Sequence, residues 1–208
     1  MKIKVIKNFL DDKDLTEISN IELKKIGSKE VKVYHNSISG EKIIKNDCID
    51  DDFLKRLNRN YHDKAVNILK ELYPEKEKLY DFSEFHLIET GANYEFVIHD
   101  DTPDKLLSGV IYLKPEKNVG TIFYKNKKGD GRNEIEWKIN KGVFFSRTER
   151  QSWHSYKGDN KSNRIALVYN LMTKRIKEVY RIENKNYFIG NLRFRLNPYL
   201  NRFFKFTL

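Results

Sequence analysis

The spacing of hydrophobic residues changes near residue 84 of the chain. Ile3 and Val5 alternate with lysines and predict an N-terminal strand, and Asp11, Asp12 and Asp14 offer caps for a short helix after it. Between Asp50 and Pro74, apolar residues recur every three or four positions, which predicts one amphipathic helix that the proline ends. These apolar positions are Phe53, Leu57, Tyr61, Ala65, Ile68 and Leu72.

After residue 84 the pattern changes to short runs of β-branched and aromatic residues, separated by polar or glycine-containing turns. Eight such runs in succession predict a mainly β fold, an antiparallel sandwich or jelly roll, with the N-terminal helices flanking it. The runs are Phe85–Thr90, Tyr94–His99, Leu106–Leu113, Thr121–Tyr124, Ile135–Ile139, Val143–Ser146, Trp153–Tyr156 and Arg164–Leu171.

Length and composition favour one domain. A chain of 208 residues with 13% aromatic residues can fill one sizeable core. We expect a strand and supporting helices in 1–83, a jelly-roll core in 84–171 and a C-terminal extension in 172–208. Cys48 is the only cysteine, which excludes an internal disulfide and a cysteine-based metal cluster. Because no unbroken apolar span suggests a signal peptide or a membrane helix, we expect a cytoplasmic protein with no membrane partner.

Positive charge is concentrated in the C-terminal extension. Of the formal net charge of +10, residues 171–208 supply +7, from nine Lys or Arg and two Glu. Cations interleaved with aromatic residues can bind single-stranded nucleic acid. The same aromatic residues suit a segment that packs on the flank of the barrel or closes a homodimer, and we favour packing. The residues concerned are Tyr187, Phe188, Phe194, Tyr199, Phe203, Phe204 and Phe206, with Arg193, Arg195, Arg202 and Lys205.

Two of the five histidines belong to a pattern with chemical meaning. His99 and Asp101 end a β-rich run, and because strand side chains repeat every two residues, they are expected on one face. His154 lies in a later run that a closed barrel can bring to the same point. Two histidines and one carboxylate are the ligands of non-haem Fe(II) oxygenases. Taken singly, each is an ordinary strand-end or turn residue, so the prediction rests on the combination. The other histidines receive no catalytic role: His35, His62 and His86.

Arg164 follows His154 by ten residues, across the turn at Gly158–Asn160. A keto acid that chelates the iron through two oxygens carries a second carboxylate, and burying that charge requires a basic partner. The forked donors of a guanidinium suit a carboxylate. Arg164 is therefore the predicted partner of the co-substrate.

Together these residues resemble the prolyl 4-hydroxylase-like branch of the Fe(II)- and 2-oxoglutarate-dependent oxygenases. The resemblance covers about 4–171. It implies a double-stranded β-helix, the jelly-roll fold of cupin-like proteins. It also implies that Tyr112 helps Arg164 to bind the distal carboxylate of 2-oxoglutarate. Ala166 departs from the pattern, because many relatives have Ser or Thr there. The matching segments beyond the metal motif are Val110–Leu113, Gly120–Thr121 and Gly142–Ser146.

The resemblance implies hydroxylation of a C–H bond with Fe(II), 2-oxoglutarate and O2, releasing succinate and CO2, with ascorbate as a candidate supporting reductant. The expected partner is a peptide, modified on a side chain, or a small metabolite. Two alternatives stay open: a nucleic-acid-modifying oxygenase that uses the basic tail, and a jelly-roll binding module without catalysis. Residues near the metal ligands in sequence are candidates for substrate contacts: Asn93, Tyr94, Arg147 and Trp153.

Overall fold

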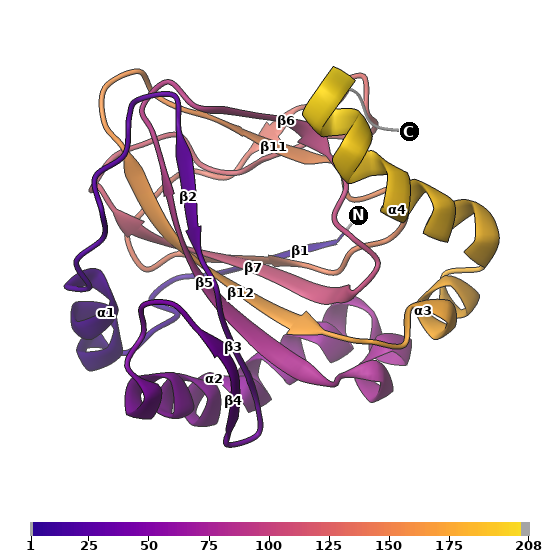
Figure 1. Cartoon of the computed structure of the whole chain (residues 1–208), viewed down its shortest axis with the longest axis horizontal. Coiled ribbons are helices and arrows are strands. Elements are labelled where there is room, and N and C mark those ends of the chain that lie inside the picture. The colour runs from indigo at the N-terminus through magenta and orange to yellow at the C-terminus, as the bar shows by residue number, and fades with distance from the viewer. Residues whose placement is uncertain (1, 205–208) are drawn as a thin grey trace.

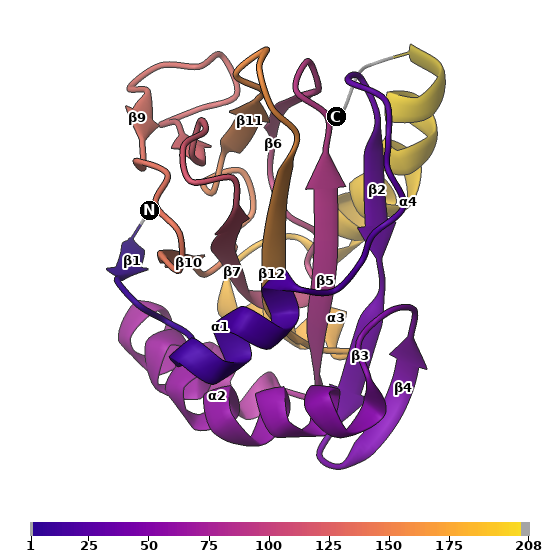
Figure 2. The ribbon, with the colours of Figure 1, turned by 90° about the vertical axis from the view of Figure 1, so that its left-hand side faces the viewer.

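The computed structural model describes residues 2–204, and for residues 198–204 it describes the helical backbone alone. The side chains of Tyr199, Arg202, Phe203 and Phe204, and all of Lys205 and Phe206, therefore lie outside the described part of the chain. Two antiparallel sheets face each other, and helices cover the outer side of the larger one (Figures 1 and 2). The mainly β, antiparallel architecture expected from the sequence is confirmed.

The larger sheet has the strand order β1-β10-β7-β12-β5-β3-β4, and β2 also pairs with β5. The smaller sheet has the order β6-β11-β8-β9. Strands of the larger sheet are β1 (Ile3–Ile6), β2 (Val31–Tyr34), β3 (Asn36–Ser39), β4 (Lys42–Asn46), β5 (Phe82–Thr90), β7 (Lys105–Lys114), β10 (Gly142–Phe145) and β12 (Arg164–Met172). Those of the smaller sheet are β6 (Glu95–His99), β8 (Ile122–Phe123), β9 (Asn133–Glu134) and β11 (His154–Lys157).

The helical layer consists of α1 (Asp12–Ser19), α2 (Asp51–Leu72) and the short 3-10 helix η1 (Pro74–Leu79). Helix α2 occupies the segment of the predicted amphipathic helix. The Asp50 side chain caps its start by accepting from the N–H groups of Asp52 and Phe53. Its apolar stripe is buried against the larger sheet, where Leu57 and Leu69 belong to the same core as Leu167. Figure 2 shows α2 running beneath that sheet.

Strand β12 shows how the larger sheet builds both the core and the site. Its alternate residues Leu167, Tyr169 and Leu171 face the helices and belong to the main core. The other alternate residues of β12 face the smaller sheet and line a cavity between the two sheets: Arg164, Ala166, Val168 and Asn170. Because the strand pairs with β5 and β7 on its two sides, it lies at the centre of the larger sheet.

Two regions differ from the sequence expectation. Strands β2, β3 and β4 were not predicted, and β3 and β4 form a hairpin that turns at Gly40 with φ of 57°. Residues 135–139, predicted as a strand, are not one: only Asn133 and Glu134 pair, as β9. The reason is local packing, because the Trp137 indole N–H donates to the Pro115 carbonyl (2.7 Å) and its ring stacks on Tyr112.

The C-terminal extension forms α3 (Ile176–Ile182) and α4 (Tyr187–Phe204). Val179 and Tyr180 of α3 are buried. Helix α4 packs on α3 through Gly190, where a Cβ would lie 2.2 Å from the Tyr180 ring. Helix α3 thus packs on the body, but the packing favoured for the tail aromatics does not extend to Phe188. In the part of α4 whose side chains are described, the exposed large apolar residues are Phe188, Ile189, Leu192 and Leu196. Within residues 2–204, no helix is both long and apolar enough to cross a membrane.

A buried carboxylate joins α1 to α2 and gives a first testable prediction. Asp14 accepts hydrogen bonds from Arg56, Asn60 and Tyr61. Burial opposes its ionisation, but these donors outweigh burial and lower its pKa. Asp14→Asn should reduce the free energy of unfolding at pH 7 by about 1–3 kcal/mol. Because the folded pKa is lowered, this contribution exists above the ordinary pKa of about 4 and is lost as the pH falls through the folded value.

Urea unfolding at a series of pH values measures this effect, and the deficit of the variant should shrink toward acid pH. The control is Asp12→Asn, at an exposed position of the same helix. A deficit that is constant with pH would show that the ionised form of Asp14 is not what stabilises the fold.

Candidate metal centre and its cavity

Backbone pairing in the smaller sheet brings together two histidines that lie far apart in sequence. Strand β6 ends at His99 and β11 begins at His154, and the antiparallel register places these two residues directly opposite each other. Their rings lie 4.1 Å apart between centroids. The prediction that the barrel would bring His154 to His99 is therefore supported by the observed register.

Asp101 lies in the loop after β6, not on the strand with His99 as the sequence suggested. Its position comes from the loop's own contacts. The Arg147 side chain donates to the Asp101 carbonyl (3.1 Å), and the neighbouring Asp100 carboxylate accepts from Ser152 Oγ and from the N–H of Arg150. One ligating atom from each of His99, Asp101 and His154 nevertheless falls within 4.8 Å of the others.

Each of the two imidazole rings is held by a hydrogen bond between its Nδ1 and a backbone carbonyl, as in many metal-binding histidines. His99 Nδ1 lies 3.0 Å from the Val97 carbonyl, and His154 Nδ1 lies 2.8 Å from the Ser152 carbonyl. A carbonyl can only accept, so Nδ1 of each ring carries a proton, and Nε2 is the nitrogen left for a metal. Burial, together with the neighbouring His154, lowers the pKa of His99 to about 3. His99 is therefore neutral at pH 7, as a metal ligand must be.

The Asp101 carboxylate is held in its charged form. Lys105 Nζ donates to Oδ1 (2.8 Å) and Ser108 Oγ donates to Oδ2 (2.6 Å). Burial alone would raise the pKa of Asp101, but the hydrogen-bonded Lys105 ammonium opposes this effect, and the pKa lies well below its usual range. Two imidazole nitrogens and one carboxylate oxygen are a donor set that suits Fe(II).

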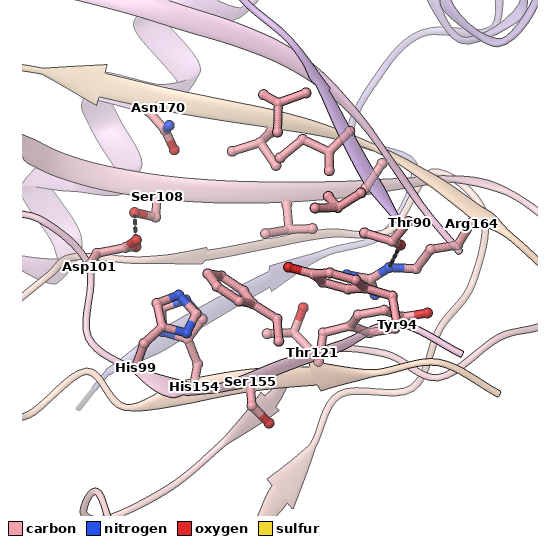
Figure 3. A pocket seen from close by; sticks show the side chains of 18 of the residues that line it. Thr90, Tyr94, His99, Asp101, Ser108, Thr121, His154, Ser155, Arg164 and Asn170 are labelled. Carbon is pink, nitrogen blue, oxygen red and sulfur yellow. Dashed lines mark hydrogen bonds between the residues drawn. The ribbon is translucent and has the colours of Figure 1, made fainter. Parts of the chain in front are cut away.

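Arg164 occupies the other end of a cavity of about 340 Å³ that the metal-binding group also lines. Its side chain donates to Thr90 Oγ1 (3.2 Å) and to the Val119 carbonyl (3.3 Å), and lies over the Tyr156 ring. Burial lowers its pKa to about 10. Within residues 2–204 no carboxylate pairs with this guanidinium, so the site fits an anionic ligand. Figure 3 shows His99 and His154 at one end and Arg164 at the other.

The remaining predicted site residues lie in different places. Tyr94 lines the cavity, as its proposed substrate role requires. The Tyr112 hydroxyl is behind the wall, where it donates to Thr121 Oγ1 (3.0 Å) and accepts from the Thr121 N–H (2.9 Å), and Thr121 itself lines the cavity. Asn93 is exposed in a turn. Arg147 and Trp153 border a second hollow of about 200 Å³, between the metal end and α4.

Sequence reasoning missed several residues on the cavity wall. Alternation along β12 from Arg164 would have pointed to Asn170, because both side chains face inward. Lys105 could have been found as a cation only four residues after the predicted ligand Asp101. No local pattern indicates the others, which reach the cavity through strand pairing alone: Thr90, Ser108 and Tyr156.

A buried ion network supports the metal end from behind. Glu183, between α3 and α4, accepts from Lys76 (2.7 Å), from Arg147 (2.7 Å) and from the N–H of Glu149 (2.9 Å). The side chains of Lys76 and Glu183 are fully buried. Since the Arg147 side chain also donates to the Asp101 carbonyl, the network connects the C-terminal extension to a candidate metal ligand.

The second prediction tests this network. Glu183→Leu leaves two buried cations without their carboxylate and should lower the free energy of unfolding by about 3–5 kcal/mol. Urea denaturation measures the loss. Glu178→Leu is the matched control, because its partner Arg181 is exposed and the pair should contribute about 0–1 kcal/mol. Equal losses in the two variants would contradict a special role for Glu183.

Comparison with known proteins identifies the fold. No sequence-family profile and no curated protein matches the chain. A 2OG-Fe(II) oxygenase family oxidoreductase from Burkholderia pseudomallei has a TM-score of 0.59 at 13% identity, covering 82% of this chain and 84% of its own. A Trichoplax adhaerens prolyl hydroxylase, in complex with a hypoxia inducible factor oxygen degradation domain peptide fragment, scores 0.58 at 15% identity, covering 85% and 86%. A Pseudomonas putida prolyl-4-hydroxylase scores 0.55 at 12% identity, covering 82% and 92%. The chain therefore has the jelly-roll fold of the 2OG-Fe(II) oxygenases, a group that includes prolyl hydroxylases.

Proposed function

We propose that the protein is an Fe(II)- and 2-oxoglutarate-dependent dioxygenase that hydroxylates a C–H bond of a peptidyl side chain or a small molecule. One observation carries the proposal. The converging ligand atoms of His99, Asp101 and His154 share a cavity with Arg164, which is buried without an acidic partner among residues 2–204. A metal site and an anion site in one cavity match a ligand that chelates iron and carries a distant carboxylate.

Each part of the cavity has a distinct task in this proposal. His99, Asp101 and His154 would hold Fe(II), which when bound supplies the chemistry that activates O2. Arg164 would pair with the distal carboxylate of 2-oxoglutarate, which restores the charge balance that burial of its guanidinium demands. The wall between the two ends is mostly apolar and includes Val110, Val168 and Phe145. Such a wall excludes water from the reacting groups.

A peptide substrate has support from one structural relative. The Trichoplax adhaerens prolyl hydroxylase of the same fold is in complex with a peptide fragment. In this chain, Phe96 of β6 lines the cavity and is 40% exposed. An aromatic ring so placed offers contact area to a peptide that approaches the cavity from solvent.

The third prediction tests the metal ligands. Anaerobic addition of Fe(II) and 2-oxoglutarate to the apoprotein should produce the visible charge-transfer band of the iron chelate. His99→Ala and Asp101→Ala should abolish this band, because each removes one of only three protein ligands. His62→Gln, a histidine of α2 outside the cavity, is the control and should keep the band. A band that persists in either ligand variant would show that the metal binds elsewhere.

The fourth prediction separates the co-substrate from the metal. Arg164→Met should weaken 2-oxoglutarate binding about 10- to 150-fold, the loss expected for a charge-assisted hydrogen-bonded pair of about 1.5–3 kcal/mol. Anaerobic titration with Fe(II) alone should give an unchanged affinity. The apoprotein should also melt at a higher temperature than wild type, because a buried guanidinium without a counterion has been removed.

Arg132→Met, at an exposed pair with Glu134, is the matched control and should change neither affinity. If Arg164→Met weakens Fe(II) and 2-oxoglutarate equally, Arg164 does not hold the co-substrate.

A further inference from the structure

The metal end of the cavity carries a row of polar side chains that the proposed iron and 2-oxoglutarate sites do not use in full. Asn170 of β12 pairs in register with Ser108 of β7 on one side and with Glu84 of β5 on the other. Asn170, Ser108 and Lys105 line the cavity near Asp101. Figure 3 shows Asn170 above Ser108, on the metal side of the cavity and far from Arg164.

A chain of hydrogen bonds fixes the orientation of the Asn170 amide. The N–H of Asn36 donates to His86 Nδ1 (3.3 Å), so the other ring nitrogen, Nε2, carries the proton. His86 Nε2 lies 3.2 Å from Glu84 Oε2, and Asn170 Nδ2 donates to the same oxygen (3.1 Å). A carboxylate only accepts, so the NH2 group of Asn170 must face Glu84 and its Oδ1 must face away.

The Asn170 oxygen is left without a partner. The residue is 1% exposed, and within the described chain no hydrogen bond reaches its Oδ1. A buried acceptor in this condition costs about 1–3 kcal/mol until a donor arrives. Because Glu84 and His86 prevent the amide from turning over, the protein cannot satisfy this oxygen by exchanging the two ends of the group.

A donor stands at the same end of the cavity. Lys105 Nζ carries three N–H groups, and Asp101 accepts from one of them. Ser108 directs its hydroxyl proton to Asp101 as well, so it adds no further donor to the cavity. At the metal end Lys105 therefore keeps N–H groups that can donate, and Ser108 Oγ can still accept. Asn170 Oδ1 is the buried acceptor there that has no donor within the described chain.

We propose that Lys105 and Asn170 form a niche that binds an amide group of the substrate, next to the C–H bond that is hydroxylated. The amide N–H donates to Asn170 Oδ1, and the amide carbonyl accepts from Lys105 Nζ. The substrate class is therefore a peptide or another compound with an N–H amide. This proposal rests on the proposed function, because it names the substrate of the same site.

Binding of matched amide and ester probes tests the niche. The probes are N-acetyl amino-acid N-methylamides, one for each common side chain, and the corresponding methyl esters, which keep the carbonyl and lack the N–H. Each is titrated anaerobically into the protein with Fe(II) and 2-oxoglutarate, and binding is followed by the shift of the chelate band. The amide that binds wild type best should bind about tenfold more tightly than its ester, the value of one satisfied buried acceptor.

Two variants separate the role of Asn170 from a merely structural one. Asn170→Leu removes the acceptor, so amide and ester should then bind within about twofold of each other. Glu84→Leu removes the acceptor that holds the Asn170 NH2 group, which lets the Asn170 amide turn over and should also reduce the preference for the amide. Asn67→Leu, at an exposed position of α2, is the control and should keep the wild-type ratio.

The outcomes distinguish this proposal from the one on which it rests. If the chelate band forms but no amide binds, if amides and esters bind wild type equally, or if Asn170→Leu keeps the preference, the niche assignment is wrong and the dioxygenase proposal stands. Binding of adenosine or cytidine in place of every amide would also overturn the niche, in favour of a nucleic-acid substrate. If wild type gives no band, the proposed function fails and this proposal fails with it.

Discussion

The candidate metal centre depends on one backbone constraint, the antiparallel pairing of β6 with β11. That register sets His99 opposite His154, at the end of one strand and the start of the other. In a sheet, a slip of one residue turns a side chain to the opposite face. A shifted register would therefore send one imidazole away from the cavity, and no adjustment of rotamers would return it. The sheet thus fixes the two imidazoles. The third candidate ligand, Asp101, lies in a loop, and side-chain hydrogen bonds hold that loop in place.

Separated charges are the second constraint on the cavity. Asp101 is negative at one end and is balanced by Lys105, while Arg164 is positive at the other end and has no acidic partner among residues 2–204. Two uncharged acceptors and the face of Tyr156 compensate the guanidinium in part. Its lowered pKa, about 10, shows that the compensation is incomplete. In the absence of a ligand, the protein bears the free-energy cost of burying the Arg164 guanidinium without a counterion. An anion that pairs with Arg164 removes this cost, and its binding is therefore favoured.

Sequence reasoning selected four candidate site residues because two histidines, a carboxylate and an arginine at this spacing form a specific combination. His99, Asp101, His154 and Arg164 all border one cavity. The sequence did not reveal that Asp101 lies beyond the end of β6, because the end of a strand depends on its pairing partners, which a single sequence does not show. The hairpin of β3 and β4 was missed because its strands are short and largely polar, so alternation is weak. Asn170 was missed because it lies within an apolar run, although the alternation of side chains along the strand from Arg164 predicts that it faces the same side.

Glu183 shows where prediction from a single sequence ends. Nothing near it in the chain marks it as different from the exposed glutamate of the preceding helix, yet its side chain is fully buried between two cations. Burial of a charge is a property of tertiary contacts, and the partners of Glu183 come from η1 and from the loop after β10. Through Arg147, Glu183 is also connected to the backbone of the candidate metal ligand Asp101. The segment that follows β12 therefore does more than cover the barrel, because the buried Glu183 carboxylate holds Arg147, and Arg147 donates to the backbone of the candidate ligand Asp101.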